Sequence, residues 1–533
     1  MARRLLWIGV VLTVAIVGID WGIRSYLKPR IGALIERIVV EGSDSLYRFA
    51  SGPPRVNLWS GTIALRDCRL TLDSARYTAR LAAGDLPALT AVVDLEEIRV
   101  SGLRVFEWWL HKRVVCGRLT LVDARASLYR HRKPSKSGKD LYTLLRPVVR
   151  SITIGEVLLG DVRLSYDNGD SARPFRWAFE RCDLRLRDIQ MDSSTVSDST
   201  RFAYAHSFTM GVKNVSILVG RQLYRLRLGS LTYDFAARAA ALEDFSLSPA
   251  LDADAFYRRV GHQADRYTLR VPSIGLYGVN MSEMLLYAYL HVDSAHLERP
   301  DIRIYHDRTQ PPDTRSKVGR YPQQLLQKAP IDILIRRLSA SSAAVEYAEK
   351  NPATDAVGTL SFDHVGALLS NVTNLPGDPR WTARFDGYCL GRSPISALFT
   401  FYLGEPSGRF SLDAHIGNLD AAALNPLTGA LAKASTGSFH MDRLDARITG
   451  DENGATGDVR MRYDHLRLTL LKGDTARRKP LLSFLVNTLA VRSGNPNGVA
   501  TGVRQTRDPH KSFFNLIWKT LYAGVKQIAL RHE

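Results

Sequence analysis

Long stretches of this chain alternate apolar and polar residues with a period of two. Residues 162–166, 225–228, 301–304 and 465–470 are clear examples. Successive side chains of a β-strand point to opposite faces, so these stretches predict strands with one apolar and one polar face. Arginine recurs at the polar positions, as is typical of a solvated face that resists edge-to-edge aggregation. The alternation therefore predicts a mainly β protein.

Predicted helices are few. Residues 282–290 and 321–328 are predicted as short helices, and residues 106–112 fit either a helix or a strand. The predicted strands recur about every ten residues between turns, which favours a sandwich, a barrel or an extended sheet. At 533 residues the chain exceeds the usual length of one domain, so we expect more than one structural unit.

A weak internal repeat relates two parts of the chain. The matched pairs are Ile152/Ile333, Ile154/Ile335, Val157/Leu338, Leu164/Val345 and Tyr166/Tyr347 at a spacing of 181, and Leu128/Ile304 and Tyr129/Tyr305 at a spacing of 176. Recurrence of this kind indicates one supersecondary unit laid in series. Within residues 51–375 we therefore expect two β-rich units, at about 60–205 and about 240–375.

The N-terminal residues predict a membrane anchor. Arg3 and Arg4 precede an uncharged apolar run, and residues 5–23 carry a single charge, Asp20. As a helix this segment spans roughly 28 Å, close to the thickness of a bilayer core. The leading arginines favour a cytoplasmic N-terminus.

A cleaved signal peptide has the same order of charge and apolar residues. Residues 17–21 (Val-Gly-Ile-Asp-Trp) provide a poor cleavage site, so an uncleaved anchor over residues 1–23 is the favoured interpretation. Residues 24–50 are predicted as a juxtamembrane helix. No second apolar run of spanning length follows, which places the bulk of the chain on the far side of the membrane.

The charge balance predicts an anionic partner. Lysine and arginine number 72 against 53 acidic residues, giving a formal net charge of +19. Such a surplus suits nucleic acid, membrane headgroups or an acidic polymer. The predicted topology argues against nucleic acid, so membrane phospholipids or other anionic amphiphiles are the expected partners.

The region from 404 to 497 has a characteristic order of elements. It has a strand at 408–412, an Asn-Pro helix around 425–429, glycine-led strands at 437–441 and 457–461, and a tyrosine-containing strand ending in leucines at 463–471. This order resembles the C-terminal region of AsmA-like proteins, and the resemblance covers about a fifth of the chain. It marks residues 376–490 as an AsmA-like C-terminal β-region.

AsmA-like proteins are single-pass inner-membrane proteins whose bulk lies in the periplasm. They are related to bridge-like lipid-transfer proteins, whose β-sheets curl into a groove or half-barrel lined with apolar side chains. The resemblance therefore implies lipid transport between membranes, or support of outer-membrane biogenesis, without a catalytic motif. The candidate groove residues are Val162, Leu164, Tyr166, Val345 and Tyr347.

A search for catalytic and metal motifs yields nothing specific. None of the 13 histidines forms a His-x-x-x-His pair, and no Gly-x-Ser-x-Gly elbow is present. The four cysteines (Cys68, Cys116, Cys182 and Cys389) lack metal-like spacing and are either paired or buried thiols. We expect no enzyme, metal or cofactor. The alternatives are a non-catalytic envelope assembly factor that binds other proteins and, less favoured, a carbohydrate-active enzyme.

The C-terminus predicts an amphipathic helix over residues 511–530, joined through a glycine-rich linker over 491–510. Its candidate residues are Phe513, Phe514, Ile517, Trp518, Leu521, Tyr522 and Val525, with Lys519 and Lys526 interleaved. Such a helix suits a membrane interface or the mouth of a groove. It equally suits a lid packed over the sheet core.

The anchor prediction can be checked on the mature protein. Because the cleavage site is poor, intact-mass spectrometry of the protein purified from membranes should show residues 5–19 retained. A mature N-terminus near Asp20 would contradict the anchor.

Overall fold

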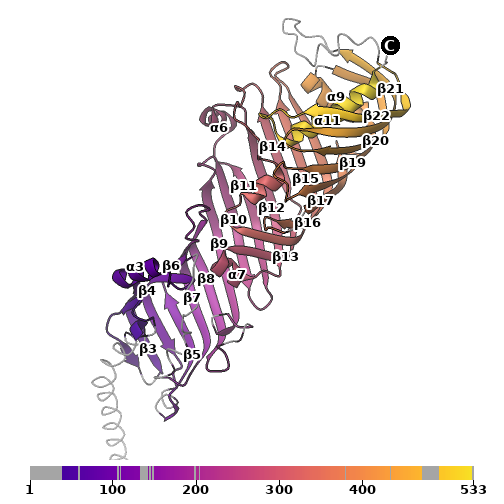
Figure 1. Cartoon of the computed structure of the whole chain (residues 1–533). Coiled ribbons are helices and arrows are strands. Elements are labelled where there is room, and N and C mark those ends of the chain that lie inside the picture. Colours follow the sequence, from indigo (N-terminus) through magenta and orange to yellow (C-terminus); the bar gives the residue numbers. More distant parts are fainter. Residues whose placement is uncertain are drawn as a thin grey trace, which may run out of the picture. The chain divides into compact units, whose positions relative to one another are not determined.

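The computed structural model describes residue 36, most residues from 39 to 470 and all residues from 491 to 530. Between 39 and 470 it leaves out short stretches, of which 132–141 is the longest. All named strands belong to one mixed sheet of 22 strands (Figure 1). The prediction of a mainly β protein with a few helices is confirmed. The predicted anchor, residues 1–23, lies outside the described residues.

The first half of the sheet is formed by β1 (Tyr47–Ala50), β2 (Arg55–Asn57), β3 (Thr62–Leu72), β4 (Leu89–Ser101), β5 (Arg113–Val122), β6 (Arg125–Arg130), β7 (Ser151–Asp167), β8 (Arg176–Met191), β9 (Ala205–Val219), β10 (Tyr224–Asp234) and β11 (Ala239–Pro249). The second half is formed by β12 (Asp265–Tyr277), β13 (Tyr289–Glu298), β14 (Asp301–Asp307), β15 (Asp332–Lys350), β16 (Val357–Thr373), β17 (Arg380–Cys389), β18 (Ser393–Tyr402), β19 (Phe410–Asp420), β20 (Ala434–Gly450), β21 (Gly454–Leu470) and β22 (Asn495–Thr506).

The helices are α3 (Ser74–Ala83), α6 (Ala253–Val260), α7 (Met281–Tyr287), α8 (Pro322–Gln327), α9 (Ala421–Ala432) and α11 (Phe513–Ala529). Helices α7, α8 and α11 confirm three predicted helices. In the ambiguous segment 106–112, Glu107, Leu110 and His111 are helical. No helix among the described residues is long and apolar enough to cross a membrane.

The chain divides into two compact units. Unit 1 comprises residues 1–213, 231–240 and 280–289, and unit 2 comprises residues 214–230, 241–279 and 290–533. Each unit is described separately below.

Strand pairing in unit 1 separates an apolar face from a charged face. On one face Ile98 pairs with Leu121, and Val157 pairs with Leu186. On the other, Glu156 accepts ion pairs from arginines on three neighbouring positions, Arg118 at 3.0 Å, Arg185 at 3.3 Å and Arg187 at 3.5 Å. Exposed pairs of this kind contribute little to stability. Their main effect is to make one face of the sheet soluble.

The sequence repeat corresponds to a repeated pairing register. In unit 1, β4 pairs with β5 from Glu97↔Val122 onward, and in unit 2, β12 pairs with β13 from Ser273↔Glu298 onward, each residue 176 positions later. Likewise β6 and β7 pair in parallel with Leu128 opposite Tyr166, and β14 and β15 pair in parallel with Ile304 opposite Tyr347. The repeated residues therefore occupy equivalent places in two similar parts of the sheet.

The repeat extends to the irregularities of the long strands. The β7–β8 register shifts between Leu159 and Val162, where Asp161 has a φ of 53°. The β15–β16 register shifts between Ala340 and Ala343, where Ser342 has a φ of 50°. A bulge adds one residue to a strand, so apolar positions three apart stay on the same face. The bulge thus keeps one face apolar along the whole strand.

Helices α3 and α6 occupy matching places before β4 and β12. Asp73 caps α3 by accepting from the Arg76 amide, and Asp252 caps α6 by accepting from the Ala255 amide at 2.7 Å. Each helix ends at a left-handed glycine, Gly84 or Gly261 in turn. An acidic cap and a terminal glycine are ordinary helix boundaries, which gives Asp252 a structural role.

Two sequence expectations are corrected. Residues 47–50, expected at the end of a juxtamembrane helix, form β1 and pair with β3 from Tyr47↔Leu72 onward. Residues 495–506, expected within a flexible linker, form β22, which pairs with β21 from Gly454↔Thr506 onward. The glycines of this stretch serve close packing, since a side chain at Gly498 would overlap Ile528 of α11.

Two buried clusters of unit 2 lie where α9 and α11 cover the sheet. One cluster combines Trp381, Phe401, Phe410 and Ile448 of the strands with Phe513 and Leu516 of α11. A second joins the apolar residues of β20–β22 to Ile528 of α11 and Ala421 of α9. Figure 1 shows both helices against this end of the sheet.

The close approach of α11 to β21 can be tested at Gly524. A side chain there would overlap Val459, so Gly524→Ala should lower the free energy of unfolding by about 1–3 kcal/mol, although alanine favours a helix more than glycine does. Gly211→Ala is the control, because its side chain would meet nothing within 4 Å. Denaturation followed by circular dichroism measures both. A Gly524→Ala protein as stable as the wild type would contradict the close packing.

Candidate functional site

Residues from four neighbouring strands form equivalent apolar rows in the two units. In unit 1 the row is Val93, Ala126, Leu164 and Phe179, on β4, β6, β7 and β8. In unit 2 it is Leu269, Ile302, Val345 and Phe362, on β12, β14, β15 and β16. Directly paired residues share a face of the sheet. The predicted groove residues Leu164 and Val345 therefore hold the same position in each unit.

The candidates of unit 1 lie in a filled part of the face. Val162, Leu164 and Tyr166 are 1%, 9% and 2% exposed. The Tyr166 hydroxyl donates to the Leu285 carbonyl of α7 at 3.1 Å, and its ring stacks on Trp177 with centroids 5.3 Å apart. Burial raises the pKa of Tyr166. Because of these contacts the Tyr166 side chain is part of the core and is not accessible to a ligand.

The more open part of the unit 1 face lies on β5, β7 and β8. Leu119, Leu121, Ile154, Leu159 and Leu186 are only partly buried there, as is Tyr204, around Val157, Ile189 and Ala205 of β9. The five partly buried aliphatic residues come from strands of one sheet. We call them the β5–β8 patch. Large aliphatic side chains at five partly open positions form a continuous apolar surface on this face.

The candidates of unit 2, unlike those of unit 1, are only partly buried. Val345 and Tyr347 lie on β15, next to Phe362 and Leu360 of β16 in the pairing register. The Tyr347 hydroxyl donates to Glu349 Oε2 at 2.9 Å. Burial, more than the nearby Glu349 charge, raises the pKa of Tyr347. This tyrosine combines an apolar ring on the row with a polar end held by a carboxylate.

The structure divides the candidates of α11 between its two sides. Phe513, Leu516 and Ile528 are 5%, 3% and 3% exposed, whereas Phe514 and Trp518 are 65% and 58% exposed. The remaining candidates, Ile517, Lys519, Leu521, Tyr522, Val525 and Lys526, are partly buried. The helix is therefore a lid on its inner side and an aromatic surface on its outer side.

An aromatic cluster fixes the first turn of α11. The Phe513 ring lies 4.8 Å from Phe410, 4.9 Å from Tyr321 and 5.9 Å from Phe401, measured between centroids. The pairs with Phe410 and Tyr321 are edge-to-face, and such pairs contribute beyond their buried area. The inner side of α11 is therefore tightly packed.

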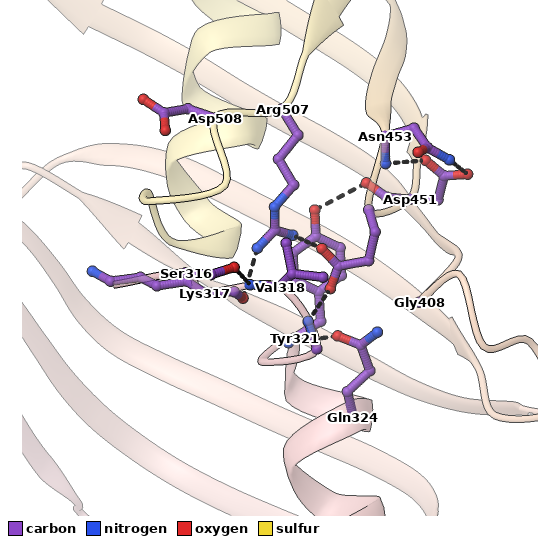
Figure 2. Close-up of polar contacts among 12 residues, drawn as sticks. Ser316, Lys317, Val318, Tyr321, Gln324, Gly408, Asp451, Asn453, Arg507 and Asp508 are labelled. Carbon is purple, nitrogen blue, oxygen red and sulfur yellow. Dashed lines mark hydrogen bonds and ion pairs between the residues drawn. The ribbon is translucent and has the colours of Figure 1, made fainter. Parts of the chain in front are cut away.

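A buried cluster around Arg507 holds the segment that leads into α11 (Figure 2). The Arg507 side chain is 3% exposed and forms an ion pair with Glu452 at 2.6 Å. It also donates to the Lys317 carbonyl at 2.8 Å and lies 4.2 Å from the centroid of the Tyr321 ring. The Tyr321 hydroxyl in turn donates to the Asp451 carbonyl at 3.0 Å. A buried charge is costly without its partner, so these groups hold three loops together.

The cysteines and acidic groups offer little chemistry. All four cysteines are free and buried, and burial raises the pKa of Cys182 to about 12 and that of Cys389 to about 11. Thiols with such pKa values are poor nucleophiles at neutral pH. Among the described residues, no group of three or more histidine, cysteine or acidic side chains is placed to hold a metal ion.

A surface pocket in unit 1 lies near the β7 bulge. It is lined by Asp123, Asp161, Arg163, Glu180 and Arg181, so acidic and basic groups are mixed in it. The Arg163 guanidinium lies 4.0 Å from Asp123. Its lining belongs to the charged face and not to the apolar face.

Sequence reasoning missed the β5–β8 patch as a site. The alternation around Leu119, Leu121 and Leu186 is visible in the sequence, but it does not tell which apolar residues remain uncovered. The repeat drew attention instead to Leu164 and Tyr166, which are both buried, and Tyr166 contacts α7 and Trp177.

No protein-family model matches this chain, and no curated protein matches it.

The two sides of α11 can be separated with adjacent phenylalanines. Phe513→Ala should lower the free energy of unfolding by about 3–5 kcal/mol, since it removes a buried ring from an aromatic cluster. Phe514→Ala should change it by no more than about 0.5 kcal/mol, since that ring is exposed. Urea denaturation of the full chain measures both. Equal effects of the two substitutions would contradict this orientation of the helix.

Proposed function

We propose that this chain is a non-catalytic, membrane-anchored periplasmic protein that binds or transfers lipids on the apolar face of its sheet. In this proposal residues 1–23 hold it in the inner membrane, with the N-terminus in the cytoplasm. Lipid handling by such a protein would serve transport between membranes or outer-membrane biogenesis. The proposal agrees with the resemblance of residues 376–490 to AsmA-like proteins.

The observation that carries the proposal is the unequal covering of the apolar face. The named strands belong to one sheet, so a second sheet does not cover this face in the described part of the chain. In the C-terminal part of unit 2, α9 and α11 complete a closed core. In unit 1, the β5–β8 patch stays partly open. An apolar surface of this kind favours an amphipathic ligand whose chains replace the missing layer.

Acyl chains suit this surface energetically. Each buried methylene contributes about 0.8 kcal/mol, so about ten methylenes contribute on the order of 8 kcal/mol before the costs of binding. The surface consists mainly of aliphatic side chains, so it suits acyl chains and leaves a headgroup in water. Such binding suits a lipid with an acyl chain better than a small polar substrate.

The equivalent rows extend the proposal to unit 2. The unit 2 row repeats the strand pairing of the unit 1 row, and its side chains are partly buried: Leu269, Ile302, Val345 and Phe362. In unit 2 this row, and not a copy of the β5–β8 patch, supplies the partly buried apolar surface. We therefore assign the same class of ligand to both units.

Photo-crosslinking in cells tests the proposal. A benzophenone amino acid at Leu186 should capture lipid, because Leu186 lies in the β5–β8 patch. Arg185 and Arg187 are matched controls, since they are its chain neighbours and point to the charged face. We expect at least about tenfold more lipid adducts at 186 than at 185 or 187. Burial of two methylenes contributes about 1.4 kcal/mol or more, and 1.4 kcal/mol corresponds to a factor of ten in occupancy.

Mass spectrometry of the crosslinked protein identifies the adducts. In unit 2, Phe362 and its neighbour Asp363 form the same kind of pair. Equal lipid capture at 186 and at its neighbours, or capture of protein alone, would contradict lipid binding on this face.

A further inference from the structure

We propose that the outer side of α11 docks the folded chain onto an anionic membrane surface. Its outer stripe consists of Phe514, Trp518 and Tyr522, spaced four residues apart along the helix, and the exposed Lys511 lies just before the helix begins. Residues with this spacing lie on one side of a helix. This surface differs from the sheet face discussed above, and its binding does not depend on lipid entering that face.

Two of the three aromatic side chains of the stripe are exposed, and the third, Tyr522, is partly buried. Phe514 and Trp518 are 65% and 58% exposed, among the most exposed large apolar side chains that the structure describes. The Trp518 and Tyr522 rings stack with centroids 6.3 Å apart and an interplanar angle of 23°. Tryptophan and tyrosine are enriched at the level of lipid headgroups because their rings are both apolar and polar. A stacked pair beside an exposed phenylalanine fits that environment.

The charges within the helical segment have one sign, and the acidic Asp508 lies just before it. From Pro509 to Leu530 the sequence contains His510, Lys511, Lys519 and Lys526 and no aspartate or glutamate. Lysines at the edge of an apolar stripe attract anionic headgroups, and each contributes about a fivefold gain in binding near such a surface. The charge pattern thus selects an anionic bilayer over a neutral one.

The support beneath α11 makes the stripe a rigid surface. Phe513 on the opposite side of the first turn lies in the aromatic cluster, and Arg507 is fastened by Glu452 and the Lys317 carbonyl. A membrane-binding helix that must fold at the surface loses conformational entropy there. A helix already fixed on the sheet avoids that cost.

The size of the stripe favours a membrane over a stable protein partner. A standard protein interface buries about 800 Å² on each partner. Three aromatic side chains that are already partly covered supply well under the 150–250 Å² each that full burial would give. Shallow insertion into a headgroup region needs no such area.

The test uses the full chain reconstituted in phosphatidylcholine nanodiscs. The nanodisc bilayer takes up the N-terminal segment, so that this segment does not itself bind the vesicles. These nanodiscs are floated with separate vesicles of equimolar phosphatidylcholine and phosphatidylglycerol, or of phosphatidylcholine alone. We expect the wild-type chain to float with the anionic vesicles. The double variant Phe514→Ser/Trp518→Ser should reduce this binding by about tenfold or more. Lys511→Glu/Lys519→Glu should reduce it for the anionic vesicles.

The control variant is Tyr277→Ser/Tyr287→Ser, which removes aromatic side chains that are 56% and 61% exposed elsewhere on the chain. It should bind vesicles as the wild type does. Melting temperature checks that all variants fold. Lipid crosslinking at position 186 should persist in Phe514→Ser/Trp518→Ser, which separates this surface from the sheet face.

Three outcomes would overturn the proposal. They are unchanged flotation of Phe514→Ser/Trp518→Ser, an equal loss in the Tyr277→Ser/Tyr287→Ser control, and a stripe variant that abolishes self-association of the chain while leaving flotation intact. The last outcome would assign the stripe to a second copy of the chain.

Discussion

The apolar face of a sheet must be covered from water, and the rest of this structure depends on what covers it. The strands alternate apolar and charged residues, so burial drives one face inward and ion pairs such as Arg66–Glu97 keep the other in water. No second sheet shares the task in the described part of the chain. In unit 2, α9 and α11 cover the face. In unit 1, the β5–β8 patch remains partly open, and we propose a lipid as its ligand.

The alternation and the repeat could be read from the sequence because both are local patterns. They place Leu164 and Val345 at equivalent positions in two units, as the pairing register has them. Which of these apolar residues are covered depends on contacts between distant parts of the chain. The Tyr166 hydroxyl donates to the Leu285 carbonyl, which lies 119 residues later in the chain. A local stretch of sequence therefore does not show that Tyr166 is buried.

The C-terminal segment shows the same limit. Phe513 and Phe514 are identical neighbours in the sequence, yet one is 5% and the other 65% exposed. Helical spacing alone assigns both to an apolar helix. The aromatic cluster and the Arg507 cluster decide which side faces the sheet, and they bring together loops more than a hundred residues apart. The glycines of β22 were equally ambiguous, because the same residues suit a linker or a close helix–sheet contact.

Lipid bound to the intact protein tests the central claim most directly. Native mass spectrometry of the full chain, extracted in mild detergent, should show bound phospholipid. The lipid should be lost from Leu121→Asp/Leu186→Asp, which places charges on the β5–β8 patch, and retained in Arg185→Asp/Arg187→Asp on the opposite face. A folded wild-type chain without lipid, or equal lipid in the two variants, would contradict the account.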